Sequence, residues 1–174
     1  MSRTFDAIDF RILAILQDNA RITQADIAKA VGLAPSAVLE RMRKLEAKGA
    51  VRDYVARIDP RVAGCSLLAF VAVRSTEYGP EAPSSLTLAA IPEVLEVHHI
   101  SGEDCYLLKV RARDAEHLGR LLRTQIAAVP NVTSTRTTIV LETVKESTRI
   151  PIHLPNRQAR DGGGRPEDAE DGDR

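Results

Sequence analysis

The chain has 174 residues, 44% of them hydrophobic, and its 24 Lys and Arg residues balance its 24 Asp and Glu residues. This length fits one large domain or two small ones, and a net charge of zero argues against a protein that coats nucleic acid nonspecifically. No apolar run is long enough to span a membrane and the N-terminus lacks a secretion signal pattern, so we expect a cytoplasmic protein without membrane contact.

Two helices are predicted first. Apolar residues recur at helical spacing over residues 6–18, which predicts a helix there. A second helix begins at Thr23, because Asp26 three residues later completes the pattern of a capping box. It ends at Gly32, since a left-handed residue that closes a helix is most easily a glycine.

A third helix and an extended connector complete the predicted N-terminal domain, residues 1–60. Pro35 suits the first turn of the third helix, which runs to Lys48. The short connection between the second and third helices is typical of a helix-turn-helix, in which one helix braces the other in the major groove of DNA. Residues 51–58 are rich in β-forming side chains and lead to a domain boundary near Pro60. The alternative is an ordinary helical hairpin with a solvated charged face.

One face of the third helix is expected to lie in the core and the opposite face to contact DNA. At 100° per residue, Val38, Met42 and Leu45 share the core face. The predicted DNA-contacting residues are Thr23 and Gln24 of the second helix and Ser36, Ala37, Glu40, Arg41, Arg43 and Lys44 of the third.

These residues are expected to have different roles. Arg43 suits a bidentate contact to guanine, whereas Arg41 and Lys44 suit phosphate contacts. Thr23 and Gln24 lie where a helix dipole favours an anion. Glu40 has two alternative roles: it accepts a hydrogen bond from cytosine, or it forms an ion pair with Lys44 four residues later.

The periodicity of the apolar residues changes after residue 66. Strands are predicted over residues 67–73, 94–100, 105–112 and 132–144, and helices over residues 83–91 and 114–129. The order βαββαβ is that of a ferredoxin-like domain, here residues 61–155, so the whole chain is predicted to be α+β. Residues 156–174 hold four Lys and Arg against six Asp and Glu with almost nothing to bury, which predicts a disordered acidic tail.

A polar turn between the two middle strands is the candidate ligand site. In Ser101-Gly102-Glu103-Asp104 the carboxylates would bind the ammonium group of a free amino acid, and backbone N–H groups would bind its carboxylate. The alternative is a plain β-turn that uses Gly and Asp for their backbone tolerance. Thr135 and Thr137 on the last strand are weaker candidates for the same site.

No catalytic site, metal site or cofactor is predicted. His98 and His99 are adjacent on a strand, so they point to opposite faces and cannot bind one ion together. Cys65 and Cys105 are the only cysteines, and their spacing gives neither a disulfide framework nor a CxxC site. No GxSxG motif or phosphate-binding glycine loop occurs, and no nucleophile is paired with a base.

Taken together, these features resemble the Lrp/AsnC (leucine-responsive, feast/famine) family of transcription factors, over about residues 4–154. The resemblance is carried by residues 5–13, 19–22, 33–38, 49–51, 59–60, 100–110 (ISGEDCYLLKV) and 135–141 (TRTTIVL). It implies dimers, often assembled into tetramers, octamers or larger particles, that bind DNA through the N-terminal domain. It also implies that the C-terminal domain pairs protomers and, in many members, binds an amino acid between subunits.

The sequence departs from the family at two positions. The family often has serine where Ala34 stands, and loss of a capping hydroxyl costs about 1 kcal/mol. The sensing loop of the family often reads Gly-x-x-Asp-Tyr. In this chain Cys105 occupies the aspartate position and Asp104 comes one residue earlier.

The sequence therefore predicts a sequence-specific DNA-binding transcriptional regulator, not an enzyme, that responds to an amino acid or related metabolite at a subunit interface. One alternative is a DNA-architectural protein without an effector. The other is an enzyme resembling the sirohaem decarboxylases, which are similar to this family in both domains, with His98 or His99 facing a tetrapyrrole.

Overall fold

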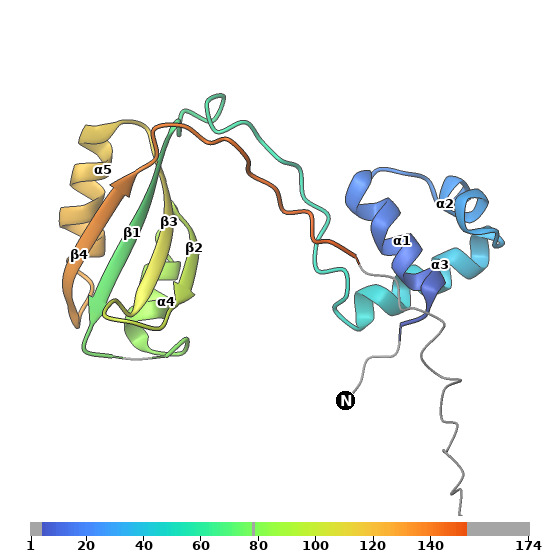
Figure 1. Cartoon of the computed structure of the whole chain (residues 1–174), viewed down its shortest axis with the longest axis horizontal. Coiled ribbons are helices and arrows are strands. Elements are labelled where there is room, and N and C mark those ends of the chain that lie inside the picture. Colours follow the sequence, from blue (N-terminus) through green and yellow to red (C-terminus); the bar gives the residue numbers. More distant parts are fainter. Residues whose placement is uncertain (1–4, 78, 153–174) are drawn as a thin grey trace, which may run out of the picture. The chain divides into compact units, whose positions relative to one another are not determined.

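The structure is a computed structural model that describes residues 5–77 and 79–152, so the predicted acidic tail lies outside the described residues. The chain divides into two compact units (Figure 1). Residues 56–146 form the second unit, and the described residues 5–55 and 147–152 form the first. The boundary thus falls a few residues before Pro60, and residues 147–152 belong to the first unit rather than to the second, where the sequence analysis placed them.

The first unit contains three helices: α1 (Ala7–Asp18), α2 (Gln24–Val31) and α3 (Pro35–Ala47). The predicted helix boundaries are confirmed by their caps, since the Thr23 hydroxyl accepts from the backbone N–H of Asp26 and Gly32 has φ 73°. The core brings together residues from all three helices: Ile12, Leu16, Ile27, Ala28, Val31, Val38 and Leu45. Met42 packs against this core while partly exposed, so the predicted core face of α3 is confirmed.

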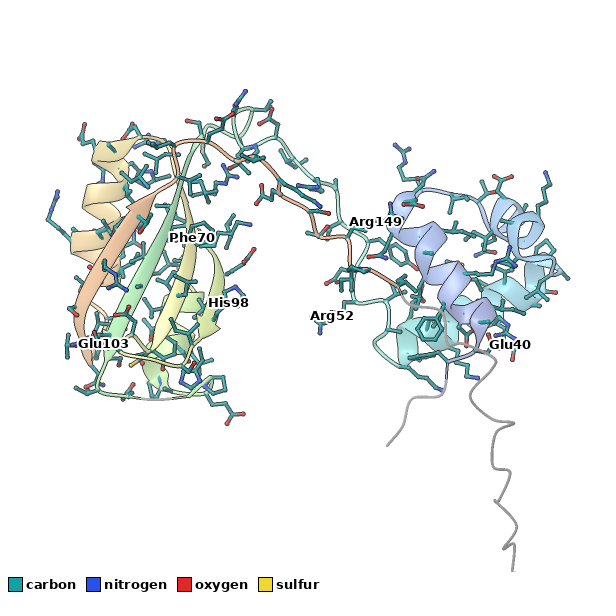
Figure 2. The ribbon with its side chains drawn as sticks, in the orientation of Figure 1. Glu40, Arg52, Phe70, His98, Glu103 and Arg149 are labelled. Carbon is teal, nitrogen blue, oxygen red and sulfur yellow. The ribbon has the colours of Figure 1, made fainter. Side chains whose placement is uncertain are left out.

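A short C-terminal segment lies against the end of α1. The side-chain amide of Gln17 donates to the carbonyl of Ile150 at 3.0 Å and accepts from its N–H at 2.7 Å. Arg149, labelled in Figure 2, forms an ion pair with Asp18. One glutamine thereby satisfies both backbone groups of Ile150, as a neighbouring strand would.

The second unit is a four-stranded antiparallel sheet with helices on one face (Figure 1). Its elements are β1 (Leu67–Ser75), α4 (Pro83–Ala89), β2 (Val94–His99), β3 (Tyr106–Ala112), α5 (Ala115–Leu121), the π-helical turn η1 (Leu122–Ile126) and β4 (Val132–Ile139). The strand order is β2-β3-β1-β4. This arrangement confirms the predicted βαββαβ order and the α+β class.

The two faces of the sheet differ. Val71 and Val73 of β1 share one core with Leu88 of α4 and Leu118 of α5, so the helices cover that face. Phe70 alternates with these valines and points to the other face (labelled in Figure 2), which no helix of the described residues covers.

Several predicted elements are too long. The last strand ends at Ile139, not at residue 144, because its partner strand β1 begins at Leu67 and offers only one further bond, from the N–H of Val140 to the carbonyl of Leu68. The helix predicted over residues 114–129 changes to a π-helical turn at Leu122. The helix predicted over residues 83–91 ends at Ala89.

Candidate DNA interface and ligand site

The face of α3 opposite its core residues is open to solvent. Ser36, Glu40, Arg43 and Lys44 are exposed and Ala37 is half-buried. Among the described residues no carboxylate forms an ion pair with Arg43 or Lys44, so the alternative pairing of Glu40 with Lys44 does not occur. Figure 2 labels Glu40 on this unit. Both cations therefore remain available to an anionic partner.

Arg41 is engaged within the protein. Its Nη1 donates to Asp6 at 2.8 Å and to Asp9 at 2.7 Å. The side chain of Asp9 is only 6% exposed and that of Arg41 29% exposed. The two aspartates also cap each other's backbone N–H groups at the start of α1. Arg41, predicted to contact phosphate, thus joins α3 to the first turn of α1.

This cluster changes the acidity of its members. The backbone N–H of Asp9 and then the Arg41 guanidinium hold the pKa of the Asp6 carboxyl below its ordinary value, although partial burial acts in the opposite direction. Hydrogen bonds to Asp6 and Asp9 raise the pKa of Arg41. The positive charge of Arg41 is thereby compensated inside the unit.

The start of α2 exposes Thr23 and Gln24. The Thr23 hydroxyl donates to the carboxylate of Asp26 at 2.6 Å while it accepts from the Asp26 N–H. Arg11 of α1 donates to the carbonyl of Ala30 at 2.7 Å, near the other end of α2. These bonds cap the start of α2 and tie its C-terminal end to α1.

The predicted ligand loop joins β2 to β3, and arginines from neighbouring strands bind its two carboxylates. Arg74 of β1 donates from Nε to the carbonyl of Glu103 and from Nη2 to the Glu103 carboxylate, each at 3.1 Å. Arg136 of β4 donates to the carboxylate of Asp104 at 2.6 Å. Gly102 adopts φ 123°, a backbone conformation that side chains rarely tolerate.

A surface depression beside this loop is lined by Arg74, Ser75, Thr76, Gly102, Glu103, Cys105 and Thr133. Two predicted effector residues, Gly102 and Glu103, belong to the lining; Ser101, Asp104, Thr135 and Thr137 do not. The register places Thr135 opposite Val73 and Thr137 opposite Val71, on the helix-covered face. Sequence analysis did not anticipate Arg74 or Thr133, because only strand pairing brings them to the loop.

Cys105 directly precedes β3 and Tyr106 is its first residue, and both side chains are buried. The Cys105 thiol lies 3.3 Å from the carbonyl of Ser75 and 3.4 Å from its N–H. The Tyr106 hydroxyl donates to the carbonyl of Gly79 at 3.0 Å. Cys105 therefore contributes an uncharged surface where the family often has a carboxylate.

The histidine pair is divided between the two faces, as predicted. His98 lies opposite Leu107 and its Nε2 is 3.0 Å from Glu96, whereas His99 lies opposite Tyr106 with ring centroids 5.8 Å apart. Within residues 5–77 and 79–152, no three His, Cys, Asp or Glu residues gather as a metal site would require. In the same part of the chain no helix has the length and apolar character needed to cross a bilayer.

Each of the two units matches a known protein domain, and relatives of one family span both. Residues 5–52 match the winged helix-turn-helix DNA-binding domain, and residues 68–150 match the Lrp/AsnC ligand binding domain. The chain is 38% identical to the HTH-type transcriptional regulator FL11 of Pyrococcus horikoshii, over 84% of this chain and 96% of FL11. It is 37% identical to the leucine-responsive regulatory protein of Escherichia coli K12, over 86% and 93%.

A solved structure extends this similarity to the fold. The feast or famine regulatory protein Rv3291c from M. tuberculosis, complexed with L-methionine, superposes with a TM-score of 0.77 at 36% identity. The match covers 87% of this chain and all of that one.

Proposed function

This chain belongs to the Lrp/AsnC family of DNA-binding transcriptional regulators, and from that membership we propose that it works in the cytoplasm as a homo-oligomer whose DNA binding responds to an amino acid. The family consists of transcriptional regulators, not enzymes, which removes the decarboxylase alternative. Beyond family membership, we propose which residues contact DNA, that the protein is a homo-oligomer, and that an amino acid is its effector.

The exposed face of α3 supports the proposed DNA contacts. Arg43 and Lys44 are exposed and form no ion pair with a carboxylate of residues 5–77 or 79–152, and Ser36 lies at the N-terminal end of the same helix. An N-terminal recognition-helix residue is well placed for base edges, and free cations suit guanine and phosphate. We assign Thr23, Gln24, Ser36, Ala37, Glu40, Arg43 and Lys44 to the interface, and Arg41 to holding α1 and α3 together.

The test is selection of duplexes from a random pool by the purified full-length protein. The affinity for a selected duplex is then compared with that for a scrambled one at physiological salt. We expect a ratio on the order of 10³ or more. A ratio near one with a steep salt dependence would instead identify a DNA-architectural protein.

The open face of the sheet supports the proposed homo-oligomer. Phe70 and Leu107 are half-buried on that face, which no helix in the described part of the chain covers. Lys109 of the same face already pairs with Glu96 and Glu146, so its charge is compensated within one protomer. Apolar side chains beside a charge that is already compensated within the protomer suit contact with the same face of a second copy.

The loop beside the depression supports the proposed effector response. The related Rv3291c protein was solved as a complex with L-methionine. In this chain the depression is lined by one guanidinium and one carboxylate, from Arg74 and Glu103. A thermal-shift screen of the twenty amino acids, with light scattering on each hit, tests the response, because a ligand that binds the folded state raises apparent stability.

A further inference from the structure

We propose that an acidic stretch of this chain, residues 167–173, occupies the exposed face of α3 when DNA is absent and competes with DNA for Arg43 and Lys44. This inference rests on the proposed DNA contacts of α3 and adds an occupant for the same surface. The match to the ligand binding domain of the family ends at residue 150, so the acidic stretch lies beyond it.

The acidic stretch is dense in negative charge. It contains no Lys or Arg and five carboxylates, those of Glu167, Asp168, Glu170, Asp171 and Asp173. Residues 153–166, which lead to it, hold three arginines and one aspartate instead. The negative charge is therefore concentrated in one block rather than spread along the segment, and such a block suits a cationic surface.

The exposed face of α3 carries more positive than negative charge. Arg43 and Lys44 lie on it, and Glu40 is the one carboxylate of this helix face. The other acidic residue of α3, Glu46, accepts from the Tyr54 hydroxyl at 2.9 Å. Within residues 5–77 and 79–152 no carboxylate forms an ion pair with Arg43 or Lys44.

Most carboxylates of the first unit already have other partners. Its described residues, 5–55 and 147–152, hold nine Lys and Arg against seven Asp and Glu. Four of these carboxylates form the ion pairs Asp6–Arg41, Asp9–Arg41, Asp18–Arg149 and Asp26–Lys29. The unit thus lacks a spare carboxylate for the cations of the α3 face, and a segment that supplies five is favoured there.

The chain leads to the acidic stretch from the same unit that contains α3. Gln17 binds both backbone groups of Ile150, and Arg149 pairs with Asp18 at the end of α1 (Figure 2). Glu167 is the fifteenth residue after Ile152, and fifteen residues span up to about 50 Å. α1 and α3 are each roughly 20 Å long, so the connecting chain is long enough to bring the stretch to α3.

The contact should be weak and reversible. Each exposed ion pair contributes little, but attachment to the same chain gives the stretch an effective concentration in the millimolar range. A carboxylate fits a guanidinium in the same bidentate manner as a phosphate does, so the stretch and DNA exclude each other at Arg43. The competition should weaken as salt rises, because both partners are exposed.

The first experiment detects the contact directly. The full-length protein is treated with a water-soluble carbodiimide, which joins a lysine amine to a carboxylate in contact with it, and the linked peptides are identified by mass spectrometry. Lys44 is the test residue and Lys145 the internal control. Lys145 is also exposed and lies 22 residues before Glu167 in the sequence, whereas Lys44 lies 123 residues before it.

We expect residues 167–173 to be linked to Lys44 at least about fivefold more often than to Lys145, and a saturating selected duplex to abolish the Lys44 links. Mere nearness along the chain would favour Lys145. Links to Lys145 that equal or exceed those to Lys44, or Lys44 links that persist on saturation with DNA, would overturn the proposal.

The second experiment measures the competition. The test variant carries Asp168→Asn, Glu170→Gln and Asp171→Asn. The matched control removes three exposed carboxylates of the second unit by Glu81→Gln, Glu116→Gln and Glu142→Gln. Both variants gain the same net charge, so a general effect of charge on DNA binding changes the two alike.

At low salt we expect the test variant to bind a selected duplex at least about threefold more tightly than the unaltered protein, and the control to change by less than about 1.5-fold. The gain should shrink as the salt concentration rises. Equal changes in the two variants would overturn the proposal and leave the DNA contacts of α3 standing. If the unaltered protein binds no duplex specifically, the proposed function fails and this inference fails with it.

Discussion

Arg41 shows that a basic side chain on a recognition helix can serve the protein rather than the DNA. It compensates the nearly buried Asp9 and also bonds Asp6. Arg41→Ala would leave a buried carboxylate without its cation, so we expect the free energy of unfolding to fall by about 2 kcal/mol or more. Urea denaturation followed by helical circular dichroism measures this, with Lys44→Ala as the exposed control. If the two variants are equally stable, Arg41 does not stabilise the fold, and its predicted role as a phosphate contact would stand.

Arg43 and Lys44 are adjacent and exposed, yet we expect different consequences when each is removed. Arg43→Ala should reduce the preference for a selected duplex by about 1–3 kcal/mol relative to a scrambled duplex, because a base contact carries sequence information. Lys44→Ala should weaken binding to both duplexes alike, because a phosphate contact carries no sequence information. It should also lower the salt dependence of binding. Competition binding at several salt concentrations separates the two. A uniform loss in both variants would contradict the base contact of Arg43.

The Asp6 carboxyl should make the first unit sensitive to acid. Its pKa is lower in the folded state than the ordinary value of 3.8, so the unfolded chain takes up the proton first as the pH falls. Its stabilising effect is complete above about pH 4 and is lost as the pH drops through the folded pKa. Asp6→Asn keeps a capping side chain but removes the charge. Urea midpoints measured between pH 2 and 6 should therefore depend less on pH in this variant, and an unchanged dependence would assign the acid sensitivity to other groups.

At the scale of the element, α3 begins without a capping side chain. Its N-cap residue Ala34 has the extended backbone that a cap requires, but no side-chain hydrogen bond. Ala34→Ser should add about 1 kcal/mol to the free energy of unfolding. Ala82 before α4 is the matched control, because the Glu77 carboxylate already accepts from the N–H of Ser84 there. Ala82→Ser should raise the free energy of unfolding by much less. Equal increases in the two variants would contradict the capping argument.

The sequence predicted those elements that local chemistry determines. Thr23, Gly32 and Pro35 mark helix boundaries through their own backbone preferences, so α2 and α3 lie where they were expected. Features that depend on a distant partner were missed. β4 ends where its pairing with β1 stops, at Ile139 opposite Ala69 near the start of β1, and Arg74 reaches Glu103 only because the chain folds back to bring β1 beside β3. The same limit explains why only two of the predicted loop residues line the depression.

At the scale of the whole molecule, the uncovered sheet face should determine assembly. Phe70→Lys would place a charge at the centre of the proposed contact, and we expect light scattering to show dissociation into smaller particles. Leu86→Lys is the control, because Leu86 is also an apolar side chain but is 60% exposed on α4. A Phe70→Lys protein of unchanged mass would exclude the sheet face as the interface.

The bond between Gln17 and Ile150 joins residues 133 positions apart, with the entire sheet unit between them in the sequence. The sheet unit is therefore an insertion within the polypeptide of the helical unit, and the chain crosses between the two units twice. During synthesis the helices can form early, but the last turn of α1 gains its partner only when the C-terminal segment leaves the ribosome. A protease that cuts one crossing would leave the two units still joined by the other.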